Sequence, residues 1–138
     1  VSEAFGGATD ASAVSSYALD GDALDVVSGS VPTTETAACW IATTSNGKFA
    51  YAGNAGSASI SGYRVGTDGA LSLLTPGGRT GTAAAGVTDL ATSGDSRFLY
   101  ARLGNGTVGG FAIAADGTLT SLGATAGLPS GAAGIAAR

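Results

Sequence analysis

The strongest constraint on this chain is an internal repeat. Residues 53–74 read GNAGSASISGYRVGTDGALSLL and residues 104–122 read GNGTVGGFAIAADGTLTSL, with Tyr63 of one copy aligned with Phe111 of the other. A further copy, VSSYALDGDALDVV, occupies residues 14–27. A unit of about 48 residues therefore occurs about three times, so the fold has to be built from similar units.

Each unit reads as four short strands. Apolar and polar side chains alternate around Phe49 and Tyr51, and again around Tyr63, which places one face of each strand in a core. Residues that favour tight turns separate these stretches, at Asn46-Gly47, Asn54, Asp68-Gly69 and Asp116-Gly117. In the middle unit we predict strands at residues 36–43, 48–53, 59–65 and 70–75. The first copy carries apolar residues in the same alternation, at Tyr17, Leu19, Leu24 and Val26.

A period of about 40 to 50 residues with several strands per unit is typical of propeller blades. The predicted fold class is all-β, a β-propeller with about three four-stranded antiparallel blades that form a portion of a larger ring. We expect a single partial domain over residues 1–138, divided into an incomplete blade (1–35), two blades (36–83 and 84–127) and a closing innermost strand (128–138). The expected partners are other propeller blades, from a companion or an identical chain, because three blades are too few to close a ring.

Composition limits the other partners. The chain has 6 basic and 10 acidic residues, so we expect no nucleic-acid partner, which would need clustered Lys and Arg. No apolar run is long enough for a membrane span. Without His, and with one Cys, the chain offers no metal-ligand spacing, and we expect no cofactor. We expect the lone Cys39 to be a buried, inert thiol of an apolar strand.

Several stretches together carry a family resemblance. TAACWIATTSNGKFAYAGNAGSASISGYRVGTDGALSLL contains one Asp-Gly-x-Leu signature and is followed by a second, at residues 116–119, and by LPSGAAG. The chain resembles the C-terminal part of the bacterial lactonase-type seven-bladed propellers, the 6-phosphogluconolactonase-like and carboxymuconate-cyclase-like family. The resemblance implies hydrolysis of a sugar lactone or a related lactone at the channel mouth of the complete ring. The alternatives are a non-catalytic propeller that binds a ligand or protein or serves as a structural scaffold, and a propeller-assembly fragment.

The resemblance also implies a catalytic role for Glu3. Enzymes of this family carry an acid at the end of a second strand, where this chain has VSE. Such a carboxylate would activate water against the ester carbonyl, with cations stabilising the oxyanion. In the following blade, where the family's enzymes tend to carry Arg, this chain has Asn54-Ala55. A solvated or turn-capping glutamate is therefore the alternative interpretation of Glu3.

Five other side chains are candidates for ligand binding. Asn54, Arg102 and Asn105 lie at comparable strand edges and could act as hydrogen-bond donors. Trp40 is interpreted as core or channel-lining, or as an aromatic floor under a sugar or another flat ligand. Asp89 takes the register of Trp40 one repeat later, so its carboxylate would face the channel, as a ligand contact or as a wall hydrated by water.

Localisation is predicted from composition. Abundant Ala, Gly, Thr and Ser, few charges and a single Cys suit an exported bacterial protein. We therefore expect a periplasmic or secreted protein, and a cytoplasmic one is the alternative.

Overall fold

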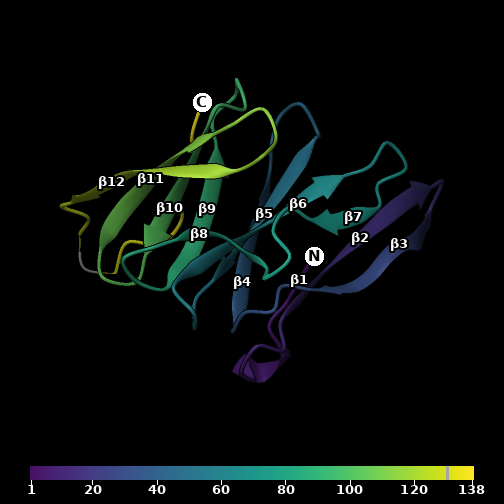
Figure 1. Ribbon diagram of the computed structural model, residues 1–138, viewed down its shortest axis with the longest axis horizontal. Coiled ribbons are helices and arrows are strands. Elements are labelled where there is room, and N and C mark those ends of the chain that lie inside the picture. Colours follow the sequence, from purple (N-terminus) through teal and green to yellow (C-terminus); the bar gives the residue numbers. More distant parts are fainter. Residues whose placement is uncertain (130) are drawn as a thin grey trace.

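The computed structural model describes residues 1–129 and 131–138. Three antiparallel sheets lie side by side in chain order, from β1–β3 at the right of Figure 1 to β9–β12 at the left. The described residues contain no α-helix, and a 3-10 turn, η1 (Phe5–Gly7), follows the first strand. None of them forms a helix that could cross a membrane. The predicted all-β fold of antiparallel blades is confirmed.

The first sheet has three strands in the order β1-β2-β3. These are β1 (Ser2–Glu3), β2 (Ala13–Asp20) and β3 (Ala23–Pro32). The β2–β3 hairpin pairs Leu19 with Leu24. The short β1 pairs with β2 and takes the position of a second strand, so the sheet has no innermost strand among the described residues.

The second sheet has the order β4-β5-β6-β7, and β8 also pairs with β6. Its strands are β4 (Ala38–Thr43), β5 (Phe49–Asn54), β6 (Ser59–Val65), β7 (Leu71–Leu73) and β8 (Arg79–Thr82). The strand predicted at residues 59–65 has these bounds, and the predicted first and second strands differ by two residues or fewer at each end.

The outermost strand of this sheet differs from the prediction. A fourth strand was expected over residues 70–75, and β7 lies within this range but is shorter. The strand β8 was not predicted; it pairs with the other half of β6, and a turn separates it from β7. The amide of Gly78 donates to the carbonyl of Thr75 (2.8 Å) and closes that turn. Arg79, the first residue of β8, then contacts Glu35 in the linker between the first two sheets.

The third sheet has four strands in the order β12-β11-β10-β9. Its strands are β9 (Val87–Thr92), β10 (Phe98–Leu103), β11 (Thr107–Ile113) and β12 (Leu119–Ala126). Its hairpin tip reaches back to the second sheet, because the Tyr51 hydroxyl donates to the Gly117 carbonyl (2.8 Å). Gly117 has φ +92°, and a Cβ atom there would lie 2.6 Å from the ring of Phe49, so only glycine fits this contact.

Two hydrophobic clusters lie between the sheets. The larger one joins the second and third sheets and includes Phe49, Tyr51, Ile60, Val87, Leu90, Leu99, Leu103 and Phe111. The smaller one joins the first and second sheets and includes Val14, Ala50, Ala52 and Tyr63. The alternation seen in the sequence thus places the two faces of β5 in different clusters. Phe49 and Tyr51 belong to the larger cluster, and Ala50 and Ala52 belong to the smaller one.

The apolar face of the first sheet is uncovered in this chain. Tyr17, Leu19, Leu24 and Val26 are 43%, 79%, 67% and 62% exposed. Tyr63, the equivalent of Tyr17 in the second sheet, is fully buried because the first sheet covers it. Among the described residues, no sheet covers the corresponding face of the first sheet.

Residues 131–138, called the C-terminal segment below, form no strand. They lie beside β9, where the Ile135 amide donates to Asp89 Oδ2 (2.7 Å). The closing strand expected over 128–138 also includes Ser130, which lies outside the described residues. A strand there needs the edge of a further sheet, so its formation in a complete ring stays a prediction.

Candidate functional site

Three of the six candidate residues gather where β10 ends and where β4 and β9 begin. These ends meet because the innermost strands β4 and β9 are antiparallel to the second strands of their sheets. A hollow of about 390 Å³, called the Trp40 hollow below, opens there between the second and third sheets. It is lined by Trp40, Thr88, Asp89, Arg102, Ala133 and Gly134. The structure thus brings three of the predicted ligand-binding residues into one site.

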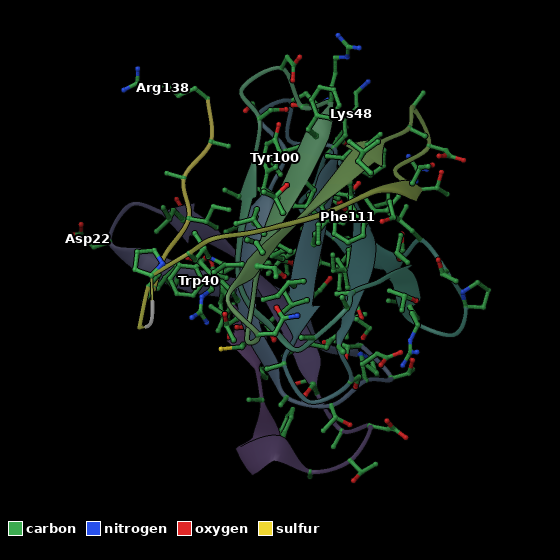
Figure 2. The ribbon with its side chains drawn as sticks, turned by 90° about the vertical axis from the view of Figure 1, so that its left-hand side faces the viewer. Asp22, Trp40, Lys48, Tyr100, Phe111 and Arg138 are labelled. Atoms are coloured by element: carbon green, nitrogen blue, oxygen red, sulfur yellow. The ribbon has the colours of Figure 1, made fainter. Side chains whose placement is uncertain are left out.

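Trp40 forms the apolar wall of this hollow. Its side chain is 49% exposed because β4 is an innermost strand that borders the channel side of the sheet. Figure 2 shows Trp40 next to the C-terminal segment, which runs on to Arg138. An indole face open to solvent at a concave site offers a flat ligand an apolar surface.

Arg102 supplies positive charge to the hollow. It lies opposite Asp89 in the β9–β10 pairing, and its Nη1 donates to Thr88 Oγ1 (2.8 Å). The Thr88 hydroxyl in turn donates to the Arg102 carbonyl (3.2 Å), so this threonine holds both ends of the arginine. Arg102 Nε is buried without a hydrogen-bond partner among the described residues. The guanidinium therefore retains unused donors.

Asp89 lines the hollow, but its carboxylate is occupied. The residue is 6% exposed. Oδ1 accepts the backbone amide of Leu90 (2.8 Å), and Oδ2 accepts that of Ile135 (2.7 Å). Each carboxylate oxygen thus accepts one backbone amide. The two interpretations made from the sequence, a ligand contact and a hydrated wall, stay predictions.

Glu3 lies apart from the Trp40 hollow and holds the first sheet together. Its Oε1 accepts a hydrogen bond from the Ser15 hydroxyl, and its Oε2 accepts one from Ser30 Oγ (2.7 Å). The hydroxyls of Ser15 and Ser30 hold the pKa of this carboxyl below its ordinary value, against the smaller opposing effect of burial. These contacts therefore make Glu3 a weaker base than an ordinary carboxylate. Its role as general base stays a prediction.

Asn54 is equivalent to Glu3 but is enclosed. It is fully buried, and its Nδ2 donates to Ser59 Oγ (3.1 Å) and Ser61 Oγ (2.9 Å). Asn54 Oδ1 has no hydrogen-bond partner among the described residues. Asn54 is therefore placed in the interior between the first two sheets and does not line the Trp40 hollow.

Asn105 belongs to a neighbouring hollow. It lies in the β10–β11 turn, where its Oδ1 accepts the Thr107 hydroxyl (2.7 Å) and stabilises the turn. Together with Arg102 and the loop after β12 it lines a more polar hollow of about 470 Å³. Arg102 borders both hollows, so it is the side chain shared by the two.

Cys39 differs from its prediction. The thiol was expected in a core, but Cys39 is exposed. The strand β4 is an edge strand of its sheet, and its pairing with β5 shifts register between Ala38 and Trp40, so Cys39 lies at an irregularity of the strand. An apolar run in an innermost strand therefore does not imply burial of every member.

Sequence reasoning missed Thr88 and Glu35. Thr88 precedes Asp89 in β9 and is recognisable as important only once β10 places Arg102 opposite it. Glu35 is a 4% exposed carboxylate that binds Arg79 through two hydrogen bonds of 2.9 Å. No cluster of three or more His, Cys, Asp or Glu side chains suited to a metal occurs in the described ranges.

Blades arranged around an open channel side define part of a β-propeller. The profile of the family described as "Lactonase, 7-bladed beta-propeller" matches residues 3–133. The chain therefore belongs to this family. A comparison with curated proteins gives no match.

Solved structures show the same fold. The periplasmic gluconolactonase of Pseudomonas aeruginosa has a TM-score of 0.67 and 21% identity, over 88% of this chain and 38% of that one. A candidate 6-phosphogluconolactonase of Bacteroides uniformis has a TM-score of 0.66 and 25% identity, over 85% of this chain and 36% of that one. A functionally unknown protein of Desulfotomaculum acetoxidans has a TM-score of 0.68 and 21% identity, over 78% and 33%. The chain thus spans less than two fifths of the length of each.

Proposed function

We propose that this chain provides part of the ligand site of a lactonase-like propeller, and that the Trp40 hollow receives a lactone or sugar ring at the channel mouth. The observation that carries the proposal is the pairing of a half-exposed Trp40 with Arg102 in one concave site. A volume of about 390 Å³ falls within the range of about 300 to 1,000 Å³ for small-molecule sites.

The two side chains suit different parts of such a ligand. The indole of Trp40 would pack against the C–H face of a ring. Arg102 would donate to the lactone carbonyl oxygen, where negative charge develops when water adds to the carbonyl carbon. Thr88 holds Arg102 through Nη1, which leaves the other guanidinium donors for the ligand.

Hydrolysis also requires a base. The base takes a proton from water as the oxygen of water bonds to the carbonyl carbon, and the ring ester C–O bond then breaks and its oxygen is protonated. Glu3 is the candidate carboxylate for this step, and a complete ring would have to bring it to the ligand. Its two serine contacts lower its basicity and support a second candidate function, a propeller that binds the same ligand without hydrolysing it.

The rest of the ring would come from companion blades. The exposed apolar face of the first sheet, with Leu19 and Leu24, supports this proposal because the equivalent face of the second sheet is buried against a neighbouring blade. We also propose export to the periplasm or out of the cell. It is supported by the composition and by the similarity to the periplasmic gluconolactonase of Pseudomonas aeruginosa.

Titration of the single tryptophan tests the binding step. Trp40 fluorescence should change on addition of D-glucono-1,5-lactone, and Arg102→Ala should weaken binding by about 10-fold or more, the usual share of a hydrogen bond from a charged donor. Lys48→Ala is the matched control, because it removes one positive charge from a turn outside the hollow. Equal binding by Arg102→Ala and Lys48→Ala would refute the proposal.

Hydrolysis separates the two candidate functions. The assay is performed on the complete ring, with lactone consumption followed by acid release. If Glu3 is the base, Glu3→Gln should lower the rate by about 10² to 10⁴ fold. Binding without hydrolysis in the parent protein would favour the non-catalytic propeller, and an unchanged rate in Glu3→Gln would exclude Glu3 as the base.

A further inference from the structure

The C-terminal segment forms one wall of the Trp40 hollow but has few bonds to the rest of the molecule. Ala133 and Gly134 face the hollow opposite Trp40. Within residues 131–138, the described hydrogen bonds are one from the Ala132 amide to Pro129 and one from Ile135 to Asp89. Only the second connects the segment to a sheet.

Asp89 is built to hold that bond. Its Oδ1 accepts the Leu90 amide of its own strand, which fixes the carboxylate on β9 and directs Oδ2 to the Ile135 amide. Gly134, with φ +85°, places the segment against the carboxylate, and a Cβ there would lie 3.7 Å from Oδ2. The side chain is 6% exposed, so little water competes for Oδ2.

We propose that Asp89 is a positioning residue that latches the C-terminal segment beside β9, where it forms one wall of the Trp40 hollow. It acts through the Ile135 amide and does not contact the ligand itself. With the latch closed, Ala133 and Gly134 limit the space beside Trp40. Without this bond, the segment would be released and Trp40 and Arg102 would be more exposed. The proposal refines the site of the proposed function, but its test needs no ligand.

The bond can be removed from either side. Ile135→Pro removes the N–H donor and leaves Asp89 and β9 intact, whereas Ile135→Ala removes most of the side chain and keeps the donor. Asp89→Ala removes the acceptor. Its matched control, Asp22→Ala, removes one carboxylate from the exposed β2–β3 hairpin, far from the latch in the sequence and on another sheet.

The first measurement is acrylamide quenching of Trp40, the only tryptophan of the chain. Trp40 is 49% exposed, so full release of the segment can raise the quenching constant by at most about twofold. We expect a clear rise for Ile135→Pro and a constant close to the parent's for Ile135→Ala. Equal constants in these two variants would overturn the proposal, because the segment would not depend on this bond.

The second measurement is hydrogen exchange of the Ile135 amide. A hydrogen bond to a carboxylate should shift the ratio of closed to open segment by about 10-fold or more, so exchange should accelerate by that factor in Asp89→Ala and not in Asp22→Ala. An Ile135 amide that is unprotected in the parent would contradict the latch. If Asp89→Ala does not fold, the Ile135→Pro and Ile135→Ala pair still decides. Failure of gluconolactone to bind would refute the proposed function and leave these results unchanged.

Discussion

The junction between the first and second sheets contains a polar network, whereas the junction between the second and third sheets is closed by aromatic and aliphatic side chains. In the first junction, buried Asn54 faces Ser61. At the equivalent positions of the third sheet, Leu103 is buried, and a Cβ atom at Gly109 would lie 3.7 Å from Leu103 Cδ1. The same repeat thus supports two chemically different interfaces.

The linkers show the same contrast. The linker before β4 contains Glu35, which accepts two hydrogen bonds from Arg79 and one from Ser59 Oγ (2.9 Å). The linker before β9 contains Ala83 and Ala85, which pack on the larger hydrophobic cluster. An apolar junction gains stability from burial in proportion to area, whereas a polar one depends on every partner being present. The second junction should therefore tolerate volume-conserving changes, and the first should tolerate few changes at Glu35.

The largest effect should come from placing the polar side chain of one junction into the other. Leu103→Asn puts an amide without partners among apolar side chains and leaves part of the leucine volume empty. We expect the free energy of unfolding to fall by about 3 to 5 kcal/mol. Urea denaturation of the parent and the variant measures it. A loss comparable with that of an exposed substitution would show that the second junction is not the dry core described.

Removal of the Glu35 carboxylate should reduce the free energy of unfolding by less than Leu103→Asn does. Glu35→Ala deletes the acceptor for Arg79 and Ser59, and we expect a loss of about 1 to 3 kcal/mol, because the half-exposed Arg79 can be hydrated again. Denaturation under the same conditions gives the value. An unchanged midpoint would mean that the network contributes specificity but no stability.

The pH dependence should report the same carboxylate. Burial alone would raise the pKa of Glu35, but hydrogen bonds from Arg79, Ser57 and Ser59 and the charge of Arg79 outweigh it and hold the pKa below its ordinary value of 4.5. The pKa is lower in the folded than in the unfolded state, so this stabilisation is present above pH 4.5 and is lost as the pH falls through the folded value.

The difference in Tm between the parent and Glu35→Gln should therefore shrink from pH 7 to pH 3. Glu3→Gln is a useful parallel, because serine hydroxyls lower the pKa of Glu3 in the same direction. A difference in Tm that stays constant over this range would be evidence against a depressed pKa of Glu35.

The smallest effect should follow the reverse exchange. Asn54→Leu removes an Oδ1 that has no hydrogen-bond partner among the described residues. The Ser59 hydroxyl keeps its hydrogen bond to Glu35, and the Ser61 hydroxyl keeps its hydrogen bond to the Thr33 carbonyl. We expect the free energy of unfolding to change by no more than about 1 kcal/mol in either direction, because the lost hydrogen bonds of the amide and the gained apolar burial are similar in size. A loss as large as that of Leu103→Asn would abolish the asymmetry between the junctions.

The sequence predicts the strands because their signal is local. The alternation around Tyr63 and the turn residues on either side define β6 to the residue. The strand β8 could not be predicted, because its first residue, Arg79, binds Glu35, which lies 44 positions away in the sequence. Burial was also hard to infer where it depends on a neighbouring blade, as for Leu19 and Leu24.

The candidate site was predicted in part for a similar reason. The repeat register identified Trp40, Asp89 and Arg102, which line one hollow. It could not predict that the Asp89 carboxylate is taken by the Ile135 amide, since no repeat relates a side chain to the backbone of a distant segment. Side-chain positions follow from register, but the occupancy of their hydrogen-bonding groups follows from the tertiary fold.

Gly117 has a consequence for the geometry of the ring. Its missing Cβ lets the hairpin tip of the third sheet rest on Phe49, so the close approach of two blades at this point depends on a hydrogen atom in place of a methyl group. In a closed ring, each blade is rotated from the next by the same angle. An alanine at this position would force the blades apart at the rim, and the error would add to the gap left where the circle closes.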